Sequence, residues 1–116
     1  MAIRPEQLKV FSQVEVDKFE EWMLVHLKKF FPAECAATDE AQLRETIRSG
    51  IKRAAAYQIT SKRDVCKYID LMVVFGRDFD VDQRSRWAGE ILGRPVDPGV
   101  KMRALFQGAK SHLTKG

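Results

Sequence analysis

The segment VCKYIDLMVVFGRDFDVDQRSRWAGEIL, residues 65–92, decides the fold. Its first part is apolar at most positions, which is typical of a buried helix. Gly76 stands where that helix should end, because glycine is favoured just after the last helical turn. Asp82 is the expected N-cap of a second helix, since its carboxylate can accept the free backbone N–H groups there. The segment therefore predicts two helices joined by a short loop, residues 76–82.

Helical periodicity continues through nearly the whole chain, without strand-like alternation of useful length and without an internal repeat. Apolar residues recur every three or four positions, and capping residues, proline or glycine mark the segment ends. The expected helices are one over residues 6–13, one from Val16 to Pro32, one with Thr38 as N-cap, one between Ser61 and Gly76, one over residues 83–92, and one that begins at Asp97-Pro98. We predict an all-α protein, a compact bundle of five to six helices in a single domain, residues 1–116, with frayed ends at 1–4 and 115–116.

One glycine inside a helix predicts where two helices cross. Gly50 interrupts the apolar stripe of the helix that begins after Thr38, and it costs about 1 kcal/mol of helix propensity relative to alanine. Such a glycine lets another helix approach closely, so we expect a crossing at this position. At the start of the same helix, Thr38 is the expected N-cap, and Asp39 and Glu40 suit the positive end of the helix dipole.

Composition limits the class of protein. The chain has 116 residues, of which 45% are hydrophobic and 31% charged, as in globular proteins with a core of their own. The longest unbroken apolar run, residues 71–75, is far shorter than the roughly 18 residues that span a bilayer. Residues 1–13 contain no apolar stretch of the kind that directs secretion, which predicts a cytoplasmic protein without membrane contact.

The two cysteines, Cys35 and Cys66, form no C-x-x-C motif. We therefore predict neither a disulfide framework nor a structural zinc site. Cys66 is expected to be a small core residue.

Three aspartates in the loop invite comparison with a calcium site. The series Asp78-x-Asp80-x-Asp82 matches the first oxygen ligands of an EF-hand loop. In a loop that began at Asp78, however, position 6 would be Gln83 instead of glycine, and position 12 would be Gly89 instead of glutamate. We therefore predict no metal here. Asp82 should cap a helix, and the other two carboxylates should accept backbone amides or pair with neighbouring arginines.

Catalytic signatures are missing from the sequence. It contains no G-x-S-x-G, glycine-rich phosphate loop or H-E-x-x-H motif, and its only histidines are His26 and His112. His26 is expected to be a half-exposed helical residue without a chelating or general-base role. We predict a protein that is not an enzyme, with no catalytic residues, cofactor or metal. An enzyme whose site forms around Asp78, Asp80 and His26 is an alternative that the sequence leaves open.

The acidic loop and the tryptophan after it are the predicted partner-binding site. If exposed, Phe79, Val81 and Trp87 would supply apolar contacts to another protein, and Asp78 and Asp80 would complement a basic partner. In the alternative, Phe79 and Trp87 are core residues under the loop. A loop of this composition can instead fasten helices together. The sequence does not decide between the two uses.

Aromatic residues off the buried stripes are a second possible contact surface. In the helix before Pro32 the predicted stripe is Val16, Phe19, Met23, Leu27 and Phe30. The aromatic residues that fall on no stripe are Phe11, Trp22, Phe31 and Tyr57. If two or three of them cluster on the outside, they would form the kind of anchor patch found at protein-binding sites.

A basic face supports a different class of function. Arg44, Arg48 and Lys52 are spaced by four residues and should form one cationic stripe on a helix, which could bind nucleic acid. Glu40 lies four residues before Arg44, so an ordinary ion-paired surface is the preferred interpretation. The net charge of +4 permits nucleic-acid binding without arguing for it.

The run YIDLMVVFGRDFD, residues 68–80, also carries a resemblance. Together with Trp87-Ala88 and Ile91-Leu92, it resembles small, mostly uncharacterised helical accessory proteins encoded beside type VI secretion effectors in Gram-negative bacteria. The pieces that fit the same resemblance upstream are His26-Leu27, Phe31-Pro32, Leu43-Arg44 and Gly50-Ile51. The resemblance implies an adaptor or chaperone for a secreted effector, and an immunity-type inhibitor of a toxin is the alternative within the same setting.

Overall fold

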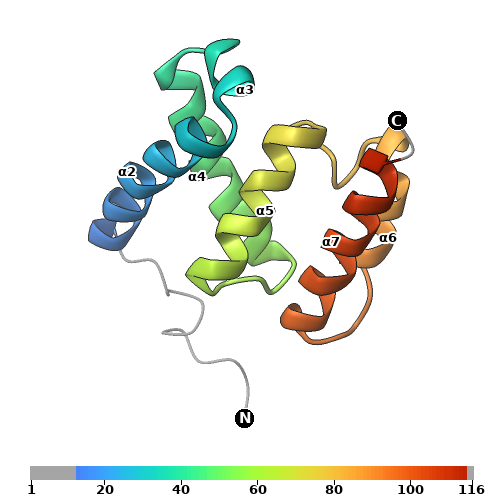
Figure 1. Cartoon of the computed structure of the whole chain (residues 1–116). Helices are drawn as coiled ribbons and strands as arrows, with labels where there is room; N and C mark the ends of the chain where they lie inside the picture. The colour runs from blue at the N-terminus through green and yellow to red at the C-terminus, as the bar shows by residue number, and fades with distance from the viewer. Residues whose placement is uncertain (1–12, 115–116) are drawn as a thin grey trace.

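This computed structural model describes residues 13–114 of the chain, which contain six α-helices and one short 3-10 helix joined by loops (Figure 1). The elements are α2 (Gln13–Phe30), α3 (Pro32–Ala36), α4 (Glu40–Ala56), α5 (Lys62–Phe75), η1 (Gln83–Ser85), α6 (Arg86–Leu92) and α7 (Pro98–Thr114). No strand occurs in this range, which confirms the all-α class. Phe11, the predicted ends at 1–4 and 115–116, and all but the last residue of the predicted helix over 6–13 lie outside the described residues.

Helix α5 is the centre of the fold, as its apolar sequence predicts. Figure 1 shows it between α2 and α4 on one side and the α6–α7 pair on the other, and it packs against α2, α4 and α7. Its buried residues are Asp64, Val65, Cys66, Tyr68, Ile69, Leu71 and Met72. A helix buried on most of its surface must be covered from several sides, so every neighbouring helix is positioned by α5.

Gly50 of α4 lies where α4 crosses α5, as predicted. A Cβ atom at this position would be 2.5 Å from Cγ1 of Ile69 and 3.0 Å from Sδ of Met72. Distances this short are not tolerated between carbon atoms in a packed core. The missing side chain therefore sets how closely the two helices approach.

The first turn of α4 corrects one predicted cap. Asp39, not Thr38, is the N-cap: its carboxylate accepts the backbone N–H of Gln42 at 2.8 Å, and the Gln42 side chain accepts the Asp39 backbone N–H at 3.4 Å. This reciprocal pair is a capping box. The hydroxyl of Thr38 donates to the same Gln42 side chain at 2.5 Å. Threonine and aspartate are both good caps, and the residue three positions on decides between them.

The predicted helix over residues 83–92 is divided in two. Asp82 is its N-cap, as predicted, with its carboxylate accepting the Arg84 backbone N–H at 2.8 Å. The first turn is the 3-10 helix η1, however, and α6 begins only at Arg86. Ser85 explains the break, because its backbone is not helical and its buried hydroxyl donates to the carbonyl of Phe79 at 2.7 Å. A short polar side chain that bonds a nearby carbonyl competes in this way with helical structure.

Candidate functional site

Phe79, at the middle of the predicted partner-binding loop, points into the protein. Its side chain is 0% exposed, and its ring centroid lies 5.1 Å from that of Tyr68. Phe79 therefore lacks the exposure that its predicted contact with a partner requires. Trp87 is half-buried, between Phe75 at a ring separation of 5.4 Å and His112 at 4.6 Å. Two of the three apolar residues assigned to a partner thus pack against the protein's own helices.

The carboxylates of the loop bind an arginine of α4. Nη2 of Arg53 lies 2.7 Å from Asp78, and Nη1 lies 2.8 Å from Asp80. The hydroxyl of Tyr57 donates to the second oxygen of Asp80 at 2.7 Å. The Asp80 side chain is only 6% exposed, so it fastens the loop to α4 and is not available to a basic partner. Pairing with an arginine agrees with the structural role expected of it, although the arginine is not one of those near the loop in sequence. Asp78 and Val81 remain exposed, and partner binding through these two residues stays a prediction.

The alternative enzyme site around the loop is not assembled. Asp80 lines a pocket of about 450 Å³ beside α6, and no histidine or cysteine lines that pocket. His26 lines a different pocket, where its partners are Cys66 and Asp70. The structure therefore does not bring His26 together with the loop carboxylates.

The predicted basic face is largely neutralised by carboxylates. Arg44 pairs with Glu40 at 3.1 Å, the contact expected from their spacing, and also with Glu20 at 2.5 Å and Glu21 at 2.7 Å. Arg48 pairs with Glu20 as well, at 2.5 Å, so both arginines tie α4 to α2. Lys52 is exposed and has no carboxylate within ion-pair distance among the described residues. Phosphate binding at this face would have to displace three carboxylates from Arg44 alone, which argues against nucleic acid as a partner.

Glu20 is the buried member of this ion cluster, with 2% exposure. Burial by itself raises the pKa of its carboxyl group, but the hydrogen bonds from Arg44 and Arg48 outweigh burial and hold the pKa below the usual value of 4.5. Such a carboxylate stabilises the folded state while it is charged.

We expect Glu20→Gln to lower the free energy of unfolding by about 1 kcal/mol at neutral pH, because glutamine loses the charge that strengthens both hydrogen bonds. The pKa of Glu20 is depressed in the folded state, so its stabilisation is fully present above the ordinary value of 4.5 and is lost as the pH falls through the lower folded pKa. Urea unfolding of both proteins between neutral pH and about pH 3 measures this difference, which should shrink on acidification. Glu45→Gln is the control, because Glu45 is 69% exposed and pairs with Arg77 at the surface. A Glu20 effect that does not change with pH would contradict the assignment.

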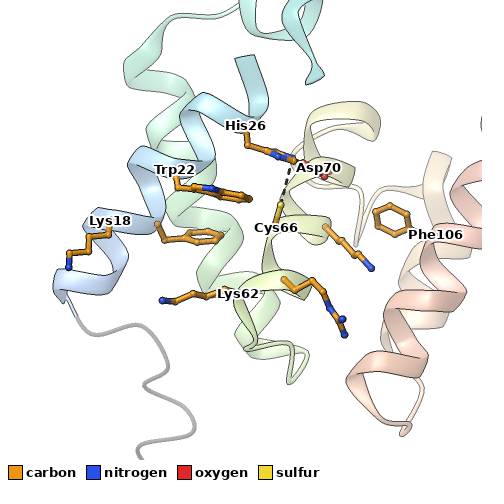
Figure 2. Close-up of a pocket in the computed structure, with 10 residues that line it drawn as sticks. Lys18, Trp22, His26, Lys62, Cys66, Asp70 and Phe106 are labelled. Atoms are coloured by element: carbon orange, nitrogen blue, oxygen red, sulfur yellow. Dashed lines mark hydrogen bonds and ion pairs between the residues drawn. The ribbon is translucent and has the colours of Figure 1, made fainter. Parts of the chain in front are cut away.

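A pocket of about 790 Å³ lies between α2 and α5, with Phe106 of α7 facing it from the other side (Figure 2). Its aromatic lining consists of Phe19, Trp22 and Phe106. Its cationic side chains are Lys18, Lys62, Arg63 and Lys67. The pocket therefore combines apolar walls with an excess of positive charge, a combination that suits a ligand with an apolar body and carboxylates.

A row of aromatic rings on α2 extends from the pocket along the surface. The ring centroids of Phe19 and Trp22 are 6.1 Å apart, those of Trp22 and His26 5.2 Å, and those of His26 and Phe30 5.0 Å. Trp22 is 54% exposed, which agrees with its place off the buried stripe. Phe30 is 59% exposed and corrects the prediction that it is buried. It follows Trp22 and His26 at intervals of four residues, so it shares the face of α2 on which these rings lie.

Phe31 and Tyr57, the two other described aromatic residues that fall on no stripe, do not join this row. Both are half-buried and pack against the core. Within residues 14–112, the exposed aromatic surface on α2 therefore consists of Trp22 and Phe30, with the half-buried ring of His26 between them.

Three groups that can bind a metal meet in the wall of the pocket. Nε2 of His26 lies 3.0 Å from Oδ1 of Asp70 and 3.6 Å from Sγ of Cys66 (Figure 2). His26 comes from α2, whereas Cys66 and Asp70 lie one turn apart on α5. Burial, with a contribution from the charge of Asp70, raises the pKa of the Cys66 thiol to about 12. Burial also raises the pKa of Asp70, although His26 acts in the opposite direction.

This cluster is not arranged as a nucleophilic triad. In a triad one ring nitrogen of histidine contacts the nucleophile and the other contacts the carboxylate, whereas here Cys66 and Asp70 both contact Nε2 of His26. A reactive cysteine also needs a lowered pKa, and that of Cys66 is raised. Sequence reasoning missed the cluster because His26 is 40 residues from Cys66 and 44 from Asp70.

No family model, curated protein or solved structure matches the chain. Within residues 13–114, no helix combines the length and the apolar character needed to cross a membrane. The pocket and the surface around it are therefore the features of the molecule that bear on its function.

Proposed function

We propose that the protein is a non-enzymatic binding module that receives an acidic and apolar segment of another protein in the pocket between α2 and α5. The observation that carries the proposal is the exposed ring of Trp22 at the edge of an apolar pocket that four cationic side chains surround. Aromatic anchors of this kind dominate the energy of many protein interfaces. The proposed site differs from the acidic loop that the sequence favours, because Phe79 is buried there.

The charges around the pocket are only weakly compensated by the described residues. Lys62 approaches Glu15 at 3.9 Å, and Arg63 approaches Asp64 at 3.9 Å. The ammonium group of Lys67 lies 5.6 Å from the ring centroid of Phe106 and therefore close to apolar surface. Positive charge that is concentrated around a concave apolar surface attracts carboxylates and speeds their encounter with it.

The size of the pocket fits a few side chains of a partner. Its volume of about 790 Å³ lies within the range of roughly 300 to 1,000 Å³ that ligand pockets occupy. The resemblance to type VI accessory proteins adds the proposal that the partner is a secreted effector, with this protein as its adaptor or chaperone. An immunity-type inhibitor would place a toxin in the same pocket.

The test uses two synthetic peptides with the same leucine and phenylalanine positions, one with aspartate and glutamate between them and the other with lysine. The full-length protein should bind the acidic peptide and not the basic one in a fluorescence titration. Reversal of two pocket charges, Lys62→Glu with Lys67→Glu, should weaken binding of the acidic peptide about tenfold or more. The matched control is Lys29→Glu with Lys52→Glu, which changes the net charge equally at residues that do not line the pocket. Equal binding of both peptides, or an equal loss in the control, would refute the proposal.

A further inference from the structure

We propose that His26, Cys66 and Asp70 together bind a zinc ion in the wall of the pocket between α2 and α5. The proposal goes beyond the docking of a partner and does not depend on it. It also departs from the sequence-based expectation of a protein without a metal. Among the described residues, this is the cluster of histidine, cysteine and carboxylate groups close enough to share an ion: the three donor atoms lie within 4.8 Å of one another.

Two of the three separations between donor atoms are close to those of tetrahedral coordination. Zinc bonds of about 2.0 to 2.1 Å to nitrogen and oxygen and about 2.3 Å to sulfur place neighbouring ligand atoms about 3.4 to 3.6 Å apart. The observed distance from Nε2 of His26 to Sγ of Cys66 is 3.6 Å, and the distance to Oδ1 of Asp70 is 3.0 Å. The third separation, from Sγ of Cys66 to the Asp70 carboxylate, is at most 4.8 Å. An ion would replace the hydrogen bond between His26 and Asp70 once the side chains had moved to the tetrahedral distances.

The helices already position the donors. Cys66 and Asp70 are separated by one turn of α5, so their side chains extend from the same face of that helix. His26 reaches them from α2, and its ring is held between the rings of Trp22 and Phe30. Little side-chain entropy remains to be lost when an ion binds, because all three groups are at least half-buried.

The chemistry of the donors selects zinc over the hard cations. Thiolate and imidazole are preferred ligands of Zn²⁺, whereas Mg²⁺ and Ca²⁺ require oxygen donors. One thiolate and one carboxylate balance the two charges of the ion, so the bound site is neutral beside the cations of the pocket. Zinc is bound by the thiolate form of cysteine, so binding of the ion displaces the proton of the Cys66 thiol.

Three protein ligands leave the fourth position of a tetrahedral ion open. His26, Cys66 and Asp70 all line the pocket, so the open position faces the space within it. A water molecule or a carboxylate group of a bound segment can occupy this position. Sites that serve only a structural role usually have four protein ligands.

Cobalt and zinc titrations of the metal-free, full-length protein test the proposal directly. Co²⁺ should produce a sulfur-to-metal charge-transfer band in the near ultraviolet and intense visible bands that report tetrahedral coordination. Zn²⁺ should abolish both at one equivalent and should raise the melting temperature, because the ion joins α2 to α5. A cobalt spectrum without the sulfur band would overturn the proposal, and this readout needs no variant.

Variants of the two cysteines and two histidines provide matched controls. Loss of a residue that only hydrogen-bonds a metal ligand typically weakens metal binding about 10- to 100-fold. Cys66→Ser and His26→Ala remove ligands themselves, so each should weaken zinc binding by more than this factor. Cys35→Ser and His112→Ala should leave affinity unchanged: Cys35 is also buried and free, and neither residue lines the pocket. Unchanged affinity in Cys66→Ser would show that zinc binds elsewhere and would overturn the proposal. Absence of zinc binding in the wild type would reduce the cluster to a hydrogen-bonded contact between helices.

Discussion

Phe79→Ala is expected to lower the free energy of unfolding by about 3 to 5 kcal/mol, the range found for buried aromatic residues replaced by alanine. Phe79 is 0% exposed and packs on Tyr68, which is also 0% exposed. Truncation would remove the ring and leave a cavity that the backbone of the loop cannot fill, because Ser85 and Arg53 hold the loop on either side. An effect of this size is a large part of the stability of an ordinary domain.

Urea unfolding at neutral pH measures the effect of Phe79→Ala, with Val81→Ala as the control. Val81 lies two residues away in the same loop and is 71% exposed, so its replacement should change stability by less than about 0.5 kcal/mol. The comparison separates the two uses that the sequence allows for the loop. A loop that fastens helices makes Phe79 essential for stability, whereas a loop that only recognises a partner would leave the two variants equally stable.

The sequence correctly predicts those features of the fold that residues close together along the chain determine. Ser61 accepts the Asp64 backbone N–H at 3.2 Å and begins α5, and Gly76 ends it with a φ of 112°, a value that favours glycine. Asp82 caps the next helical turn. Each of these signals is complete within a few residues, so no knowledge of the tertiary structure is needed to interpret it.

The role of the acidic loop could not be read from its own residues. The arginine that binds Asp78 and Asp80 is Arg53, which lies on α4, and not one of the arginines near the loop in sequence. Whether Phe79 points inward depends on this contact with α4, since the contact fixes the side of the loop that faces the core. The composition of the loop is the same for either orientation.

The candidate metal cluster also depends on a contact between residues that are distant in sequence, but part of it has a local signal. Cys66 and Asp70 are four residues apart on a predicted helix, a spacing at which two side chains can share a ligand. The third donor, His26, lies on another helix, and nothing local connects it to that pair. The Cys66–Asp70 pair on one helix face therefore indicates two of the three donors.

Gly50→Ala is expected to lower the free energy of unfolding by about 2 kcal/mol, even though alanine is the better helix former. The new Cβ would lie 2.5 Å from Cγ1 of Ile69, a branched side chain that cannot swing away within the core. Overpacking of this kind costs up to about 3 kcal/mol, from which about 1 kcal/mol of gained helix propensity is subtracted. Gly93→Ala is the control, because its Cβ would meet nothing closer than 3.4 Å and its φ of −79° suits alanine.

A double-mutant cycle assigns the cost of Gly50→Ala to its cause. In an Ile69→Ala background the atom that meets the new Cβ is absent, so the same substitution should cost about half as much or less. Urea unfolding of the four proteins gives the coupling energy between the two positions. If the cost were equal in both backgrounds, contact with Ile69 would not set the distance between α4 and α5. Glycine at the crossing would then need another explanation.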